Sequence, residues 1–296
     1  MALVAPLPTV AVRSRSRLWG VPVYWHLLSL DAPTVAVLWA WSFARAAGIR
    51  IPLIGIAVLG VGTWIIYVAD RILDAGSPEH PALHERHFFH ARHRTSLLQS
   101  SAVAGALLLG LISIMPGRPR REDAIVFAVA MLYFAGVHLP ALRVRRWFPR
   151  EVAVGIVFAL ATAVPAWSGA ASGRAELGCL VVLFAGLCTL NCIAIETWEG
   201  PAAFPGSIVV SIFALCVAGA SIAFLLIPDL GSRGDSGLCA ASLLSSMLLL
   251  VLDQFYRGFV RGPADPEKHA RRLLGLRIAA DAALLTPIFL LLPWHL

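Results

Sequence analysis

The chain has 296 residues, of which 58% are hydrophobic and only 14% are charged, and its mean hydropathy is +0.78. A soluble domain carries about a quarter charged residues, and one aqueous core could not hide this much apolar surface. Composition therefore excludes a soluble enzyme, a disordered chain, a fibre and a disulfide-stapled secreted module, and it predicts an all-α, polytopic membrane bundle.

A helix that crosses a bilayer needs roughly 20 mainly apolar residues. Applied along the chain, this length predicts about nine transmembrane helices, separated by breakers such as Pro116-Gly117. These spans use nearly the whole chain, so we expect one integral membrane domain over 1–296, with 1–25 as an N-terminal arm. The expected spans are 31–47, 51–74, 95–115, 123–142, 151–171, 175–198, 206–227, 236–256 and 272–292.

The formal net charge is +7, and the positive residues lie in short loops between apolar runs. This placement is a topology signal more than a binding patch, so no nucleic-acid partner is expected. With the N-terminus in the cytoplasm, 17 Lys and Arg residues fall on the cytoplasmic side, six fall on the other side, and Arg45 lies near a span end. The positive-inside rule therefore predicts a protein of the cytoplasmic membrane with its N-terminus inside and its C-terminus outside.

Acidic residues close two of the expected spans, although ionisable groups inside a bilayer are expensive. Asp70 and Asp74 are four residues apart at the end of the second span, so one helical face presents both carboxylates, with Tyr67 one turn earlier. Glu196 and Glu199 are three residues apart at the end of the sixth span. Four crossings separate these spans, so both acidic pairs are expected at the same membrane face.

Two carboxylate pairs at one end of a bundle could hold hard divalent cations. Mg²⁺ commonly takes one or two carboxylates together with phosphate oxygens and water. A diphosphate could then be held between the pairs through bridging metal, with nearby arginines taking the remaining charge. The simpler alternative is that each pair marks a helix end that emerges into water.

These acidic motifs resemble those of the UbiA superfamily of intramembrane prenyltransferases, which are nine-helix bundles with a polar cytoplasmic cavity. The family motif N-D-x-x-D-x-x-x-D at the end of helix two aligns with Ile66-Tyr67-x-x-Asp70-x-x-x-Asp74, where the last two acids match. The motif Y-A-x-x-D-x-x-D-D at the end of helix six aligns with Cys192-Ile-x-x-Glu196-x-x-Glu199-Gly200.

A third family element, P-x-x-K-R-x-T-x-x-P-Q after helix four, is similar to a segment that keeps the spacing between its two prolines. That segment reads Pro140-x-x-Arg143-Val144-x-Arg146-x-x-Pro149-Arg150. The chain departs from the family in two places. The opening Asn and Asp of the first motif are missing, and both acids kept in the second motif are Glu.

The resemblance implies Mg²⁺-dependent transfer of a prenyl group from a polyprenyl diphosphate to a lipophilic acceptor, either aromatic or lipid. The catalytic residues and metal ligands that it implies are Asp70, Asp74, Glu196 and Glu199. The substrate-binding residues that it implies are Tyr67, Arg71, Arg86, Arg143 and Asn191. The departures from the motifs leave open a non-catalytic relative that keeps the bundle and binds a lipid or a partner.

Five of the nine histidines lie in the loop 78–94, after the second span. His80, His84 and His87 would share one face of a helix, so a metal site there is conceivable. The membrane di-iron enzymes rely on several histidine boxes, however, and the remaining histidines, His26 among them, are scattered singly.

The same loop carries arginines for which two interpretations stay open. The resemblance implies a lid over the diphosphate, with Arg86 as the best candidate for a diphosphate ligand. For Arg92 and Arg94 the alternative is an amphipathic interfacial helix that basic residues hold to anionic lipid headgroups.

Charged residues also occur in the last two expected spans. Asp253 with Arg257, and Arg277 with Asp281, are four residues apart, and we expect them to form pairs within their own helices. Asp31, near the start of the first span, is more simply an acid at a helix N-terminus.

Overall fold

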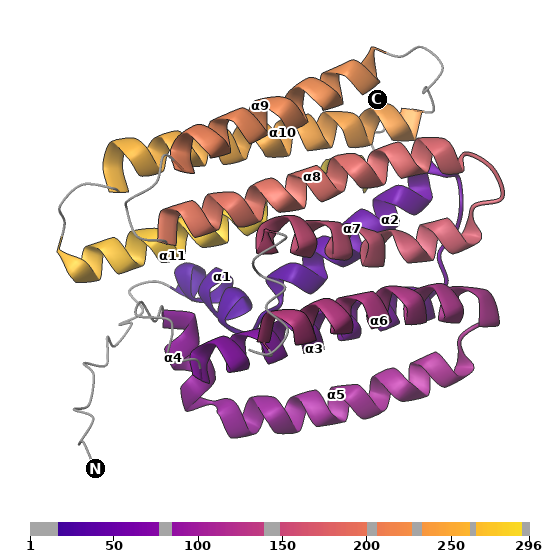
Figure 1. Ribbon diagram of the computed structural model, residues 1–296, viewed down its shortest axis with the longest axis horizontal. Coiled ribbons are helices and arrows are strands. Elements are labelled where there is room, and N and C mark those ends of the chain that lie inside the picture. The colour runs from indigo at the N-terminus through magenta and orange to yellow at the C-terminus, as the bar shows by residue number, and fades with distance from the viewer. Residues whose placement is uncertain are drawn as a thin grey trace.

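The computed structural model describes residues 17–76, 85–138, 149–199, 206–226, 233–260 and 265–291. Every regular element in these ranges is a helix. Long helices satisfy their own backbone hydrogen bonds, which is what a chain surrounded by lipid requires. The long helices lie side by side as a bundle along the longest axis of the molecule (Figure 1).

The chain folds into helices that follow one another with short connections. Their bounds are α1 (Arg17–Leu27), α2 (Asp31–Ala46), α3 (Leu53–Gly76), α4 (Glu85–Arg92), α5 (Arg94–Ile114), α6 (Gly117–His138), α7 (Arg150–Gly169), α8 (Arg174–Glu199), α9 (Gly206–Leu225), α10 (Arg233–Phe255), η3 (Tyr256–Val260), α11 (Pro266–Ala283) and α12 (Ile288–Leu291). The η3 segment is a π-helical turn that continues α10.

Within the described ranges, six helices are long and apolar enough to cross a membrane, which confirms the prediction of an all-α membrane protein. They cover Leu53–Asp74, Arg94–Ile114, Arg150–Gly169, Arg174–Glu199, Ile208–Leu225 and Asp235–Val260. The count rises to seven if α1 and α2, which are bent by 88° at their junction, form one broken span. The predicted count of nine is not confirmed.

Three expected spans are missing from the six: 31–47 at α2, which has only 16 residues, 123–142 at α6 and 272–292 at α11, and the last two are still missing when α1 and α2 count as one broken span. α6 carries five charged residues within its first seven positions. α11 begins Pro-Glu-Lys-His-Ala-Arg-Arg and has further charges along its length. As described, neither α6 nor α11 therefore contains an apolar stretch long enough to cross a membrane.

Of the N-terminal arm expected over 1–25, the structure describes the part from Arg17 onward, and that part is helical. α1 ends at Leu27, and Ser29 adopts a left-handed backbone conformation with φ of 59°. This conformation is rare for a residue other than glycine. It lets the chain turn sharply into α2 and brings the end of α1 beside the start of α2.

α8 lies at the centre of the bundle, and its apolar side chains are buried against α7, α9 and α10. The ring of Trp39 in α2 stacks on Phe184 in α8 at a centroid distance of 4.2 Å. The Trp39 indole nitrogen donates to the carbonyl oxygen of Leu284 at 2.8 Å, which satisfies its polar group inside the core.

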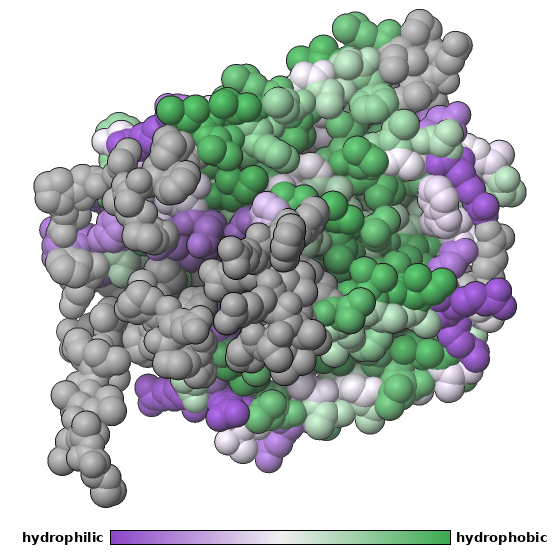
Figure 2. Space-filling model, in the orientation of Figure 1, coloured by the Kyte–Doolittle hydropathy of each residue, from purple (hydrophilic) through white to green (hydrophobic). Residues whose placement is uncertain are grey.

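α5 lies at the periphery, and large apolar side chains along its length are exposed. They include Val103, Leu107, Leu109 and Ile114. Figure 2 shows hydrophobic residues across the middle of the bundle and hydrophilic residues towards its two ends. An exposed apolar band of this kind is the surface expected of a protein that contacts acyl chains.

The C-terminal ends of α3 and α8 and the N-terminal ends of α7 and α11 all lie at one end of the bundle (Figure 1). The structure thus places the two acidic helix ends on the same side, as the alternation of spans predicts. We call this the polar end of the bundle.

Candidate functional site

The first predicted acidic pair, at the end of α3, is held by an arginine from α7. Arg150 Nη2 donates to both carboxylate oxygens of Asp70, at 3.0 and 3.1 Å, and to Asp74 Oδ2 at 3.4 Å. The two carboxylates therefore converge on one cationic nitrogen, as their i,i+4 spacing on a helix allows. All three side chains are partly exposed at the polar end.

The second predicted pair, at the end of α8, is not held as a pair. Glu199 accepts from Arg277 Nη1 through both carboxylate oxygens, each at 2.9 Å. Glu196 is exposed. The structure thus joins Glu199 to α11 through Arg277.

The structure separates the other predicted substrate-binding residues. The ring of Tyr67 meets that of Phe158 edge to face at 6.2 Å. Arg71, the residue after Asp70, joins a buried cluster described below. Asn191 Nδ2 donates to Asp281 Oδ1 at 3.2 Å, which brings it to the same cluster.

Several predicted residues fall where the structure gives no side-chain description. Arg143 lies outside the described residues, and Arg86 is in α4 with its side chain outside them. The same holds for His80 and His84, which lie in the undescribed segment 77–84, and for the side chain of His87. The proposed roles of these residues stay predictions.

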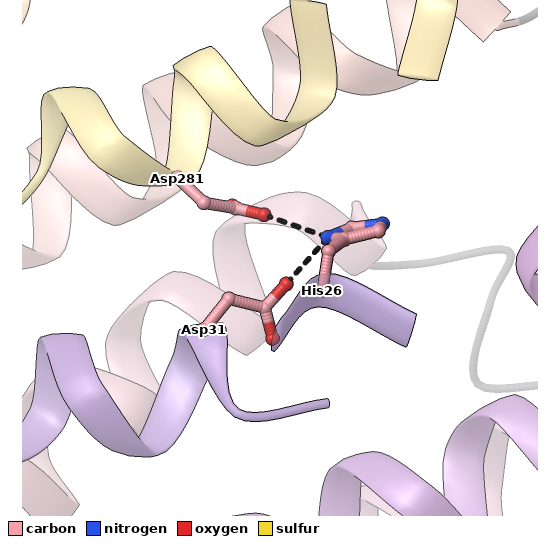
Figure 3. Close-up of side chains that lie close together, drawn as sticks. All are labelled: His26, Asp31 and Asp281. Atoms are coloured by element: carbon pink, nitrogen blue, oxygen red, sulfur yellow. Dashed lines mark hydrogen bonds and ion pairs between the residues drawn. The ribbon is translucent and has the colours of Figure 1, made fainter. Parts of the chain in front are cut away.

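A buried cluster of ionisable side chains lies where α1, α2 and α11 meet (Figure 3). His26 Nδ1 donates to Asp31 Oδ2 at 2.7 Å and lies 3.5 Å from Asp281 Oδ2. His26 is 1% exposed and Asp31 is 9% exposed, so water screens the contact between them only weakly, whereas the side chain of Asp281 is 21% exposed. We call these three residues the His–Asp–Asp cluster.

Neighbouring groups hold the cluster in place from two more helices. Arg71 of α3 donates to the carbonyl oxygen of His26 at 2.6 Å and to Asp31 Oδ2 at 3.3 Å. Asn191 of α8 holds one oxygen of Asp281, and the backbone amide of Ala32 donates to Asp31 Oδ1 at 3.0 Å. The site therefore draws on five helices that are far apart in the sequence.

The elements explain why these side chains meet. Asp31 begins α2, where the positive end of the helix dipole favours a carboxylate. The left-handed turn at Ser29 brings His26, one residue from the end of α1, back against it. Within the described chain, the oxygens and nitrogens of three or more metal-ligating side chains come within 4.8 Å of one another only at His26, Asp31 and Asp281.

A cavity of about 190 Å³ adjoins the His–Asp–Asp cluster, and all three of its residues line it. The other walls are mainly apolar side chains of α1, α2 and α11, including Val21, Val35 and Ile278. An engineered cavity of about 150 Å³ is large enough to hold benzene, so this space can hold a small group.

The sequence did not point to this cluster. It presented His26 as an isolated histidine and Asp31 as a helix N-terminal acid, and Asp281 was expected to pair with Arg277. In the structure Arg277 pairs with Glu199, and Asp281 contacts His26 instead. The one available signal was a charge in an apolar span, which is costly unless it has a partner or a function.

The other expected intrahelical pair is present. Arg257 donates to Asp253 Oδ2 through Nη2 at 2.6 Å and through Nε at 2.9 Å. Trp198 Nε1 also donates to Asp253 Oδ1 at 3.0 Å, so this fully buried carboxylate ties α8 to α10.

Comparisons with protein-family models, with curated proteins and with solved structures found no match to this chain. The site is therefore interpreted from its own geometry and chemistry.

Proposed function

We propose that the chain is an integral membrane prenyltransferase that transfers a prenyl group from a polyprenyl diphosphate to a lipophilic acceptor. In this proposal it is a divergent UbiA-like bundle of about nine spans in the cytoplasmic membrane, with its N-terminus and its polar end in the cytoplasm. The observation that carries the proposal is the convergence of Asp70 and Asp74 on one cationic nitrogen of Arg150, at the polar end of an apolar bundle.

This arrangement fits Mg²⁺, because the guanidinium nitrogen stands where two carboxylates already face one positive charge. Asp70 and Asp74 would hold the ion, and such sites commonly complete their coordination with phosphate oxygens and water. Bound Mg²⁺ would supply charge neutralisation for the departing diphosphate. The part of Glu196 and Glu199 as further ligands stays a prediction, since Arg277 holds Glu199.

Arg150 is suited to bind the diphosphate itself. A guanidinium group matches phosphate oxygens as well as it matches carboxylates. When the two aspartates bind a metal ion, Arg150 can exchange its carboxylate partners for phosphate oxygens over a short distance. In the proposal Arg143 and Arg86 add further positive charge, and their roles stay predictions.

Aromatic rings lie beside the proposed diphosphate site. Tyr67 is one helical turn before Asp70, and its ring contacts Phe158, whose ring lies 6.0 Å from that of Phe184. The faces of such rings stabilise a nearby cation. In the proposal Tyr67 faces the allylic carbon as its bond to the diphosphate breaks, and the prenyl tail extends into the apolar part of the bundle.

The test is transfer of label from radiolabelled farnesyl and geranylgeranyl diphosphate to lipid in membranes that contain the full chain, with and without Mg²⁺. We expect Mg²⁺-dependent labelled product, and we expect Asp70→Asn to lower it by about 100-fold, as loss of a charged group at a transition state does. Asp123→Asn, the same substitution in α6, is the matched control and leaves the product unchanged. No product from the wild type, or equal product from Asp70→Asn, contradicts the proposal.

One observation favours a second candidate, a non-catalytic protein that binds an anionic lipid. Arg150 and Arg277 neutralise three of the four predicted acids, and the motif positions before Asp70 lack the expected Asn and Asp. A chain that binds labelled diphosphate without forming product would support this candidate over the enzyme.

A further inference from the structure

The proposed function does not use the His–Asp–Asp cluster. We propose that His26, Asp31 and Asp281 form a second metal site, which binds a divalent transition-metal ion such as Zn²⁺, Mn²⁺ or Fe²⁺ independently of the acidic pair on α3. The inference depends on the described cluster alone and not on prenyl transfer.

The spacing of the three ligand atoms suits one ion. Two ligands at about 2.1 Å from a metal lie about 3.0 Å apart at octahedral angles and about 3.4 Å apart at tetrahedral angles. The Nδ1 atom of His26 lies 2.7 Å from Asp31 Oδ2 and 3.5 Å from Asp281 Oδ2, and these separations bracket that interval. All three ligand atoms lie within 4.8 Å of one another, so a small movement of the two carboxylates would place them around one ion.

The orientation of the carboxylates also suits a metal. In each carboxylate one oxygen is held by an amide donor, Asp31 Oδ1 by Ala32 N and Asp281 Oδ1 by Asn191 Nδ2. The other oxygen of each faces His26. Metal sites use such outer hydrogen bonds to fix the direction of their ligands.

Charge gives a separate argument. The cluster contains two carboxylates and one guanidinium, that of Arg71, so one negative charge is left for a cation to balance. An uncompensated charge in a buried site is costly. A divalent ion that displaces the proton between His26 and Asp31 would balance this negative charge and leave one positive charge, which a hydroxide or another anionic ligand on the ion can balance, while Arg71 keeps its contact with Asp31.

Buried polar atoms without partners point to a missing ligand. Asn191 is 8% exposed, and its Oδ1 has no hydrogen-bond partner although its Nδ2 holds Asp281. The Nε2 atom of His26 is also buried without a partner. A water molecule on the metal ion would give Asn191 Oδ1 the donor that it lacks, and buried polar groups seldom remain unsatisfied.

The donor set and the cavity decide the kind of ion. One imidazole nitrogen with two carboxylates suits Zn²⁺, Mn²⁺ or Fe²⁺, whereas Mg²⁺ prefers oxygen ligands alone. The cavity of about 190 Å³ next to the cluster provides an entry path and room for further ligands on the ion. The two sites of the protein would therefore differ in the metal they select.

The test is Mn²⁺ binding to the purified full chain in nanodiscs after chelator treatment, followed by electron paramagnetic resonance. We expect one bound Mn²⁺ with electron spin-echo modulation from a directly coordinated ¹⁴N nucleus, and displacement of that ion by Zn²⁺. His26→Gln removes the ¹⁴N signal and lowers the affinity by at least about 10-fold, because even the loss of an outer-shell partner of a metal ligand costs about 10–100-fold. Asp281→Glu, which keeps the carboxylate, retains the ¹⁴N signal.

Asp70→Asn is the matched control, because it alters the proposed magnesium site and leaves the ¹⁴N-coupled Mn²⁺ unchanged. Loss of prenyl transfer in that variant with intact Mn²⁺ binding separates the two proposals. The wild-type spectrum decides the inference even if a variant fails to fold. Absence of bound Mn²⁺, or bound Mn²⁺ without ¹⁴N coupling, overturns the inference. The negative charge of the cluster is then balanced by the proton between His26 and Asp31 and not by a metal ion.

Discussion

The acidic pair on α3 and the His–Asp–Asp cluster are both ionisable sites in an apolar bundle, but they are built differently. Asp70 and Asp74 lie on one face of one helix, partly exposed, with an arginine that can exchange partners. His26, Asp31 and Asp281 come from three helices and are surrounded by buried groups from two more. The proposed function requires the first arrangement to open to a charged ligand, whereas contacts from two further helices hold the second.

The largest expected effect on stability is at the buried cluster. Asp31→Asn leaves the Arg71 guanidinium, which is 5% exposed, without its charged partner. Breaking one side of a buried ion pair costs about 3–5 kcal/mol of unfolding free energy. Asp74→Asn at the polar end, where Arg150 is 33% exposed, is the matched variant and should cost about 1 kcal/mol or less.

Denaturant unfolding of both variants in detergent micelles measures this difference. Equal losses at the two positions would contradict the distinction between a packed cluster and an exchangeable pair.

Arg150 should matter more for activity than for stability. Arg150→Ala removes the cation that faces Asp70 and Asp74 and that the proposal assigns to the diphosphate, so we expect prenyl transfer to fall by about 100-fold. Arg150→Lys keeps the charge but loses the planar donor geometry and should recover part of the rate. Initial rates at saturating Mg²⁺ provide the measurement, and a full rate in Arg150→Ala would exclude this role.

Close packing of α7 on α8 positions Arg150. A Cβ atom on Gly155 would collide with Thr189 Oγ1 and would lie 2.8 Å from the backbone nitrogen of Thr189. Gly155→Ala must therefore push the two helices apart, at a cost of about 1–3 kcal/mol. Gly105→Ala in α5, where a Cβ atom meets nothing within 4 Å, is the control. Similar midpoints of thermal unfolding for the two variants would show that the contact does not constrain α7.

The smallest expected effect is at Glu196, which is exposed. Glu196→Gln should change the free energy of unfolding by less than about 0.5 kcal/mol, as for most surface substitutions. The same variant shows whether the α8 pair takes part in catalysis. A loss of transfer in Glu196→Gln with unchanged stability would extend the proposed magnesium site from α3 to α8.

The comparison also explains what could be predicted from the sequence. The i,i+4 spacing of Asp70 and Asp74 and the apolar spans are local patterns, and the structure confirms the membrane helices and places the two acidic helix ends at one end of the bundle. The ion pair of Asp253 with Arg257 is local in the same way and was predicted.

Contacts between distant segments could not be predicted in this way. Asp281 and Arg277 have the spacing of an intrahelical pair, but the direction of α11 gives each a partner on another helix. His26 and Asp281 are 255 positions apart by residue number, so no short-range pattern links them. The count of nine spans is not confirmed, because α2 is only 16 residues long and the described helices α6 and α11 begin with clusters of charged residues.

The central claim is that Asp70, Asp74 and Arg150 bind a diphosphate together with Mg²⁺. The most direct measurement is equilibrium binding of a radiolabelled, non-hydrolysable farnesyl thiodiphosphate to the purified chain in nanodiscs, with Mg²⁺ or with a chelator. The account predicts saturable binding that requires Mg²⁺ and is lost in both Asp70→Asn and Arg150→Ala. Binding that ignores Mg²⁺, or that persists in these two variants, would contradict it.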